Sequence, residues 1–397
     1  MVTDLRRRYN SEFSLDRYRE FIRELENVFP GQLDFRVAET PVFVPKDFTA
    51  KIISACDNII DVTSSPAYLK ESEKAIPFEL RVPNEDAHPH CIAFDFGVCK
   101  NADGELEPQL IEMQGFPSLF AWEVLLPEIH AKHFFTPPGY SVYLNGHDRD
   151  SYIRLLRKII VGDEDPANVV LLEIAPHQQK TRVDFYATET LLGIPTMDLM
   201  DVIQEGKELY YLDDGKKVRI KRIYNRVIFD DLFQQPADVQ QKGAMFQQEL
   251  DVTWVPHPNW FYRLSKYTLP FIQHPFVPET HFLNGMQRPD DLQNYVVKPL
   301  FSFAGQGVII DVTPEDIAAI RDPENWIIQR KVNYAAAIET PDEPAKAEIR
   351  IFYFWEEGKL RPVAANNLSR LSKGKMIGVR YNKDKEWVGG SFCLFEQ

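Results

Sequence analysis

The sequence predicts a mixed α+β protein built from more than one domain. Its 397 residues exceed the ~150 residues of an average domain, and 44% of them are apolar, which is enough to bury a core in each part. An apolar strand at 168–174, followed by a loop and a helical pattern at 183–192, is typical of an open α/β sheet. Strand-like stretches separated by turns follow from Trp326 onward.

Each expected element rests on a local pattern. Residues 15–28 place apolar and aromatic side chains on one helical stripe behind Ser14, a favoured N-cap residue, and 46–62 is expected to form a second helix. Strands expected at 91–98 and 108–113 flank an Ala-Asp-Gly turn signal. The elements expected further along are a helix at 151–160, the strand at 168–174, the helix at 183–192 and β-rich pieces at 217–229 and 295–312.

The charge balance limits the classes of partner. Acidic residues number 59 against 45 basic ones, and the net charge of −14 opposes binding to nucleic acid or to anionic lipid. The amino-terminal segment carries charges where a signal peptide needs an apolar run, and no stretch reaches ~18 apolar residues. We therefore expect a cytoplasmic protein with no nucleic-acid or membrane partner. Its four cysteines form no CxxC pair and are expected to be reduced thiols.

Three oxygen-bearing side chains converge on one face of the predicted hairpin. If its Asp-Gly pair forms the turn, Asp95 faces Glu112 and Ala93 faces Gln114, and the alternation of strand side chains puts the three polar groups together. Opposed carboxylates repel, so a positive group should occupy the gap, and Mg²⁺ fits carboxylate and amide oxygens best. A solvated hairpin face is the alternative, and Pro108 can introduce a bulge that shifts the register.

A second candidate site surrounds a lysine that ends an apolar strand. Lys298 is followed by a loop of small residues, including Gly305 and Gly307, and then by a second apolar strand. Backbone N–H groups and an ammonium in such a loop can approach phosphate oxygens. The segment lacks the GK[ST] of a P-loop and does not fit GxGxxG. A plain hairpin whose lysine reaches solvent is the alternative.

Further charged residues lie along the same half of the chain. Lys266 precedes Lys298, and the apolar strand at 326–332 ends in polar residues that can present backbone groups to an adenine edge. Arg350 and Arg370 lie on later strand patterns. Each of these residues taken alone is typical of a surface charge.

Taken in order, these motifs resemble the ATP-grasp superfamily in a circularly permuted arrangement. The acidic hairpin, which comes last in ordinary ATP-grasp enzymes, comes first here. This order is similar to that of glutathionylspermidine synthetase and, more distantly, of eukaryotic glutathione synthetase. The resemblance covers residues 91–370 and consists of the hairpin, the LLGIP segment, the strand IYNRVIFDDL, Lys266, the Lys-Pro and glycine loop, QRKV and Arg370.

The resemblance implies a role for each matching residue. Metal ligands for one or two Mg²⁺ ions would be Asp95, Glu112 and Gln114; catalytic candidates are Arg370, which would stabilise the transferring phosphate, and Arg350; substrate-binding candidates are Arg226 and His177. The residues expected to bind ATP are Lys266, Lys298, Ser302, Gly305, Gln306, Gly307, Gln329, Arg330, Lys331 and Val332.

The sequence departs from the family pattern at three positions. Gln114 stands where the family has Asn, a longer amide with the same ligand oxygen. Ala93 stands where glutathionylspermidine synthetase has a phosphate-binding arginine, and Ser302 replaces an acidic metal ligand of eukaryotic glutathione synthetase. We also expect no amidase domain before the grasp region. These departures argue against the specific synthesis of glutathionylspermidine.

The resemblance implies a carboxylate–amine ligase that uses ATP and Mg²⁺ and forms an acyl-phosphate intermediate. Its partners would be a small carboxylate and a small amine, with the protein acting as a monomer or a homodimer. The alternatives are an ATP-grasp-like nucleotide-binding protein with weakened catalysis and a phosphotransferase on the same scaffold.

The resemblance also implies how the chain is divided. The expected fold is an ATP-grasp core with an inserted Rossmann-like α/β substrate domain and a small α+β lid. The expected parts are a core with the acidic hairpin at 1–140, the substrate domain at 141–255, a return to the core at 256–272, a lid with the glycine-rich loop at 273–330, and core again at 331–397.

Overall fold

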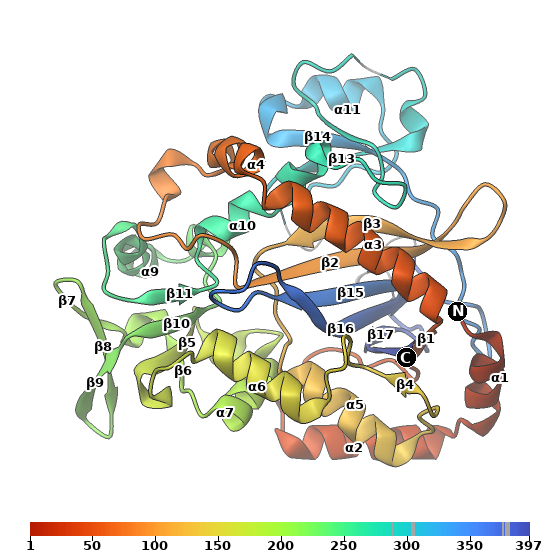
Figure 1. Ribbon diagram of the computed structural model, residues 1–397, viewed down its shortest axis with the longest axis horizontal. Coiled ribbons are helices and arrows are strands. Elements are labelled where there is room, and N and C mark those ends of the chain that lie inside the picture. Colours follow the sequence, from red (N-terminus) through yellow and green to blue (C-terminus); the bar gives the residue numbers. More distant parts are fainter. Residues whose placement is uncertain (288, 303–305, 375–376, 378–381) are drawn as a thin grey trace.

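The computed structural model describes residues 1–287, 289–302, 306–374, 377 and 382–397. Within these ranges the chain forms five β-sheets with helices packed around them, so the mixed α+β class is observed (Figure 1). One sheet has five strands, one has four and three have three each. Gly305, which was expected to bind ATP, lies outside the described residues.

The helices expected near the amino terminus and in the middle of the chain are confirmed. Ser14 caps α2 by accepting a hydrogen bond from the backbone N–H of Arg17. The α-helices of the described residues are α1 (Thr3–Glu12), α2 (Leu15–Val28), α3 (Lys46–Thr63), α4 (Pro66–Glu71), α5 (Trp122–His133), α6 (Arg149–Ile160), α7 (Arg182–Leu192), α8 (Phe229–Leu232), α9 (Ala237–Gly243), α10 (Asn259–Arg263) and α11 (Pro314–Ala319).

An antiparallel sheet of five strands forms the centre of the molecule. Its order is β17-β16-β15-β2-β3, so the hairpin β2–β3 is joined to strands from the last part of the chain. Their bounds are β2 (Cys91–Lys100), β3 (Leu106–Gln114), β15 (Lys346–Phe354), β16 (Val363–Ser372) and β17 (Gly389–Ser391).

The hairpin has the predicted register where it matters for the site. Asp95 faces Glu112 and Ala93 faces Gln114. The register then shifts, because Ile111 is an extra residue in β3. The loop that joins the strands, 101–105, is longer than the expected two-residue turn. The anticipated bulge is therefore present, on the turn side of the acidic pair.

The two faces of the central sheet are buried in different ways. One face carries Phe94 and Ile351 in the same apolar cluster as the buried side of α3. On the opposite face, Ala93 and Phe352 share a cluster with Trp122 of α5. Further along this second face the side chains change from apolar to charged, so the face that helices bury at one end carries ionised groups at the other.

A parallel sheet of four strands forms the α/β part of the chain, as the strand–loop–helix pattern predicted. Its order is β11-β10-β5-β6, with α6 and α7 beside it (Figure 1). The β-rich piece expected at 217–229 ends earlier, at Asn225 of β10, and its last residue, Phe229, is the first residue of the helix α8. The bounds of the four strands are β5 (Val169–Glu173), β6 (Thr196–Asp198), β10 (Arg222–Asn225) and β11 (Thr253–Val255).

A third sheet lies at one end of the molecule with α11 (Figure 1). We call it the lid sheet only because its strands fall within residues 273–330, the part that the sequence led us to expect as a lid. It consists of β12 (Thr280–Phe282), β14 (Trp326–Arg330) and β13 (Tyr295–Pro299), all antiparallel. The second strand expected after the glycine loop was wrong: Ile309 makes only an isolated bridge to Val297. On its other edge, strand β13 pairs along its whole length with β14, and the paired strands bury a small core of their own.

Two small sheets complete the fold. One joins β1 (Val42–Val44), β18 (Cys393–Glu396) and β4 (Tyr140–Ser141), and the other joins β7 (Ile203–Glu205), β8 (Glu208–Asp213) and β9 (Lys216–Ile220). All four cysteines are free and buried, as expected of reduced core thiols. In the described part of the chain, no helix combines the length and the apolar character that crossing a membrane requires.

Candidate functional site

The central sheet brings five charged residues to one face. Asp95 of β2 is the cross-strand partner of Glu112 on one side and of Arg350 on the other. One step along the sheet, Glu348 of β15 faces Arg370 of β16. Since cross-strand partners point to the same face, these five side chains form one cluster, which we call the charged cluster.

Two arginines hold the carboxylate of Asp95. Arg350 donates from Nε to Oδ1 and from Nη2 to Oδ2, both at 2.6 Å, and Arg370 Nη2 donates to Oδ2 at 2.9 Å. The Asp95 side chain is only 1% exposed. Burial opposes its ionisation, but the two guanidinium groups and their hydrogen bonds hold the pKa of Asp95 below its ordinary value. Asp95 is therefore a charged partner of both arginines.

Glu348 is the second buried carboxylate of the charged cluster. Its Oε2 lies 3.1 Å from Arg370 Nη2. Burial, followed by the opposing attraction of Arg370 and the repulsion of Asp95 and Glu112, raises the pKa of Glu348 to about 7. Glu348 is thus the member of the cluster that changes charge near neutral pH.

The expected magnesium ligands differ in how free they are. Glu112 is 29% exposed, and its Oε1 lies 4.0 Å from Arg350 Nη2. Gln114 lies one step along the same face, opposite Ala93. Both oxygens of Asp95 already accept hydrogen bonds from guanidinium groups, and no group of three or more acidic, histidine or cysteine side chains in the described residues could hold a metal. Of the three expected ligands, Asp95 is thus the one whose carboxylate oxygens are already bonded to arginines of the chain.

Lys298 reaches the charged cluster from the lid sheet. Its ammonium donates to the side-chain oxygen of Gln329 at 2.6 Å and to the backbone oxygen of Ile111 at 3.2 Å. Ile111 is the bulged residue of β3, so the bulge supplies the carbonyl that meets the lysine. Burial lowers the pKa of Lys298 to about 8, although Glu112 partly offsets this effect.

Lys266 approaches the cluster from a third direction. It follows α10, and its ammonium donates to the backbone oxygen of Ser302 and lies 3.4 Å from the Ser302 hydroxyl. Gly115, directly after β3, makes this approach possible: a Cβ atom there would lie 2.6 Å from the backbone oxygen of Trp260 in α10. Burial lowers the pKa of Lys266, and Glu112 raises it in part.

The other residues expected to bind ATP differ in what their side chains contact. Ser302 contacts Lys266, and Gln329 contacts Lys298. The side chains of Arg330 and Lys331 instead contact other residues of the lid: Arg330 donates to the Tyr295 hydroxyl at 2.9 Å, and Lys331 donates to a backbone oxygen of the 292–294 turn. Val332 is half-buried, and the described loop residues Gln306 and Gly307 are exposed.

The two expected substrate residues follow strands of the parallel sheet. Arg226 comes directly after β10, donates to the Pro117 backbone oxygen at 2.7 Å and lies 5.0 Å from the centre of the Phe116 ring. It thereby touches the segment that leaves β3 and the cluster. His177 lies after β5 and is exposed, with its Nδ1 2.9 Å from the Tyr186 hydroxyl. The structure thus connects Arg226, but not His177, to the end of the hairpin.

The structure adds residues that the sequence prediction missed. The ring of Tyr334 lies over Gly97 of β2, where a Cβ atom would be 2.7 Å from Tyr334 Cε1. Thr280 of the lid sheet accepts a hydrogen bond from Gln329 Nε2 at 3.0 Å and so orients the amide that meets Lys298. A glycine inside a strand often marks such a close approach, and Gly97 was the signal available for Tyr334.

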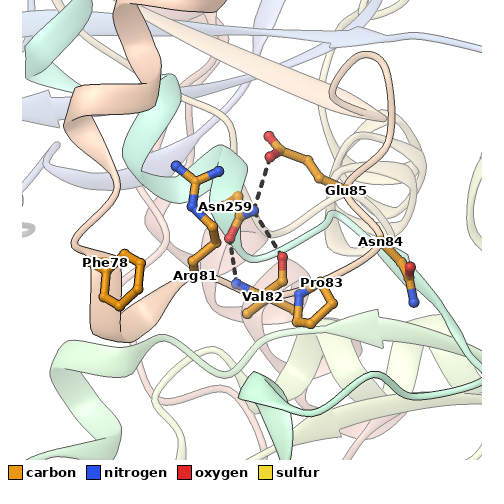
Figure 2. Close-up of a pocket in the computed structure, with 7 residues that line it drawn as sticks. All are labelled: Phe78, Arg81, Val82, Pro83, Asn84, Glu85 and Asn259. Carbon is orange, nitrogen blue, oxygen red and sulfur yellow. Dashed lines mark hydrogen bonds between the residues drawn. The ribbon is translucent and has the colours of Figure 1, made fainter.

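One cavity has none of the residues of the charged cluster in its lining. It has a volume of about 490 Å³ and is lined by Phe78, Arg81, Val82, Pro83, Asn84, Glu85 and Asn259 (Figure 2). Asn259 bonds both the N–H and the C=O of Val82 and also reaches Glu85 (Figure 2). Arg263 of the same helix is paired with Glu85 as well. These contacts anchor α10, which leads to Lys266.

Two comparisons with known proteins found similar proteins, one by sequence and one by structure. No protein-family model matches the sequence. A Frankia alni protein named "Putative glutamate--cysteine ligase 2-3" is 25% identical over 197 residues, which is 41% of this chain and 22% of that protein. The chain thus spans less than a quarter of that relative's length.

The structural comparison covers almost the whole chain. The apo structure of a glutathione synthetase-like effector from Globodera pallida superposes with a TM-score of 0.59 over 97% of this chain and 98% of that one, at 11% identity. The chain therefore has the mixed α+β fold of a glutathione synthetase-like protein.

Proposed function

We propose that this protein is an ATP- and Mg²⁺-dependent carboxylate–amine ligase on a circularly permuted ATP-grasp fold. In this proposal the parallel sheet belongs to an inserted substrate domain and the lid sheet covers the nucleotide, with the boundaries expected from the sequence. The main support is the convergence of two buried lysines, Lys266 and Lys298, with two arginines around Glu112.

The lysines support a polyphosphate ligand because their charges are not neutralised. Within the described ranges neither ammonium forms an ion pair; Lys298 bonds an amide and a backbone oxygen, and Lys266 bonds Ser302. Burying an unpaired ammonium is costly, and burial lowers the pKa of both lysines. A phosphate chain would supply the missing negative charge.

Each group in the site would have a distinct task. Bound MgATP would supply the phosphoryl group that activates a substrate carboxylate for attack by an amine. Lys266 and Lys298 would hold phosphate oxygens, and Arg370 would offset charge on the transferring group. Glu112 and Gln114 have the oxygen donors that Mg²⁺ prefers. In the part of the chain that the structure describes, neither accepts a guanidinium hydrogen bond like those at Asp95, although Glu112 Oε1 lies 4.0 Å from Arg350 Nη2.

The names of the relatives agree with this reaction class. Glutamate–cysteine ligase and glutathione synthetase, the activities in those names, both describe ligases of small amino-acid-derived molecules. The position of Arg226, beside the segment that leaves the hairpin, is suited to a substrate carboxylate. The order of the elements, with the hairpin β2–β3 before Lys266 and β13, is that expected of the permuted arrangement.

Nucleotide-dependent thermal stability tests the proposal. At a free ligand concentration of 100 times Kd, binding should stabilise the native protein by about 2.7 kcal/mol. We expect MgATP or its non-hydrolysable analogue to raise the Tm of the wild type and of Lys216→Met, which changes an exposed lysine, but not of Lys298→Met. If the wild type shows no shift and calorimetry detects no heat of binding, the proposal fails.

Product analysis then separates the ligase from its alternatives. A ligase releases ADP and phosphate only when both a carboxylate and an amine are present. A stable phosphorylated product formed without the amine would indicate a phosphotransferase. Nucleotide binding without turnover across carboxylate and amine panels would indicate a nucleotide-binding protein.

A further inference from the structure

A guanidinium group lies beside the gap between two facing carboxylates. Asp95 and Glu112 are directly opposed in neighbouring strands, where like charges repel. Arg350 Nη2 lies 2.6 Å from an oxygen of Asp95 and 4.0 Å from an oxygen of Glu112. The positive charge that this pair requires is thus already part of the chain.

We propose that Arg350 is the resident cation of the acidic hairpin, in the position where a divalent ion would otherwise bridge Asp95 and Glu112. Asp95 is then a positioning residue for Arg350 and Arg370. One consequence of this inference rests on the proposed function: the metal ion that accompanies the nucleotide would be held by Glu112 and Gln114, without Asp95.

The geometry of the Asp95 contacts supports this assignment. Arg350 uses two nitrogen atoms on two oxygens, a bidentate arrangement that fixes the plane of the guanidinium. Arg370 takes a further position on Oδ2 and is held on its other side by Glu348. A divalent ion bound to Asp95 would have to displace at least one of these donors and leave a buried guanidinium without its partner.

The charges of Arg350 and the two facing carboxylates also support the assignment. If Arg350 neutralises the pair, the hairpin should bind a divalent ion weakly in the absence of nucleotide. Removing the guanidinium should restore two facing carboxylates and hence a stronger divalent site, since Mg²⁺ and Mn²⁺ favour such oxygens. A metal site already built on Asp95 predicts no such gain.

Direct titration with Mn²⁺, without nucleotide, tests the inference. We expect Arg350→Gln to bind Mn²⁺ at least about tenfold more tightly than the wild type, because a repulsive carboxylate pair gains a cation. The double variant Arg350→Gln/Asp95→Asn should return to the wild-type affinity. Arg361→Gln is the matched control: it removes an exposed arginine from between Asp57 and Asp61 and should leave Mn²⁺ affinity within about twofold of the wild type.

Two outcomes would overturn the inference. One is an unchanged or weaker Mn²⁺ affinity in Arg350→Gln that has wild-type circular dichroism. The other is a large loss of Mn²⁺ affinity in an Asp95→Asn variant that also has wild-type circular dichroism, which would make Asp95 a metal ligand. If Arg350→Gln does not fold, Arg350→Lys is measured in its place. Because Arg350→Lys keeps a positive charge, its Mn²⁺ affinity should equal that of the wild type. A tenfold gain in the affinity of Arg350→Lys would contradict the proposal. The absence of a thermal shift with nucleotide would reject the ligase proposal but leaves this titration interpretable.

Discussion

Arg350 is the direct cross-strand partner of Asp95, and its guanidinium donates to both oxygens of that carboxylate although the two residues lie 255 positions apart in the chain. The pair joins the early hairpin to the late strands of the central sheet. It also decides the charge available at the site, because Asp95 is fully engaged while Glu112 remains partly exposed.

Replacing Asp95 by Asn should strongly destabilise the protein. The substitution leaves the buried guanidinium of Arg350 without its ion-pair partner, and breaking a buried pair in this way costs about 3–5 kcal/mol. Urea unfolding should show the loss as a lower midpoint. Asp213→Asn, at an exposed carboxylate, should change the free energy of unfolding by less than about 0.5 kcal/mol. Equal effects of the two variants would show that the Asp95 pairs do not stabilise the fold.

Asp95 should also contribute to acid sensitivity. Its native pKa is depressed, whereas the unfolded value is about 3.9. Its contribution to stability is therefore complete above about pH 4 and is lost as the pH falls through the lower native pKa. Between about pH 4 and pH 2, the wild type should lose more free energy of unfolding than Asp95→Asn does. Parallel acid titrations of the two proteins would contradict this assignment.

Replacing Glu112 by Gln should separate stability from metal dependence. Because Glu112 is 29% exposed and only 4.0 Å from Arg350, the free energy of unfolding should change by less than about 1 kcal/mol. Under the proposed function, the Mg²⁺-dependent part of the nucleotide thermal shift should disappear. Glu105→Gln, in the exposed hairpin loop, should keep the full shift. A wild-type response in Glu112→Gln would exclude Glu112 as a metal ligand.

Lys298 should give the protein a characteristic alkaline pH dependence. Its native pKa is about 8 against an ordinary lysine value of 10.5, so between these values the unfolded chain binds a proton that the native lysine has released. The free energy of unfolding of the wild type should therefore rise across this window relative to Lys298→Met. Chemical denaturation at intervals from pH 7 to about pH 10.5 measures the difference. A flat difference would show that Lys298 keeps an ordinary pKa.

Replacing Gly97 by Ala should disturb the contact with Tyr334. The new methyl group would lie 2.7 Å from Tyr334 Cε1, too close for carbon atoms, and such overpacking costs about 1–3 kcal/mol. Gly390→Ala in the same sheet is a suitable control because its Cβ would meet Phe35 at an ordinary 3.5 Å. If Gly97→Ala is as stable as this control, Tyr334 moves aside at no cost. The double variant with Tyr334→Ala should recover part of the loss.

The local elements were predictable from residues close together in the chain. The helical stripe behind Ser14 and the apolar strand at 168–174 both formed, because their patterns depend on near neighbours. The hairpin register at Asp95 and Glu112 followed from strand alternation and a nearby turn, although Ile111 forms a bulge and the turn is longer than expected.

The pairing of the segment after the glycine loop could not be predicted from the local sequence pattern. The apolar residues around Ile309 are suited to a strand, but β13 pairs with β14, which lies further along the chain. Ile309 and Val297 exchange two backbone hydrogen bonds on one edge of β13, while β14 pairs with the whole of the other edge. How far each edge of a strand is paired depends on tertiary packing rather than on strand propensity alone.

By itself, the sequence determined that two carboxylates face each other near an amide and that this pair needs a positive charge, because hairpin geometry follows from contiguous residues. Only the tertiary structure decided that Arg350 and Arg370 supply the positive charge beside the Asp95 carboxylate. It also decided that the Lys298 ammonium contacts the backbone oxygen of the bulged residue Ile111. The physical reason is that the neighbours of a strand in a sheet, and the register between strands far apart in the chain, are set when whole faces are buried together, and alternation within one strand does not specify its partner.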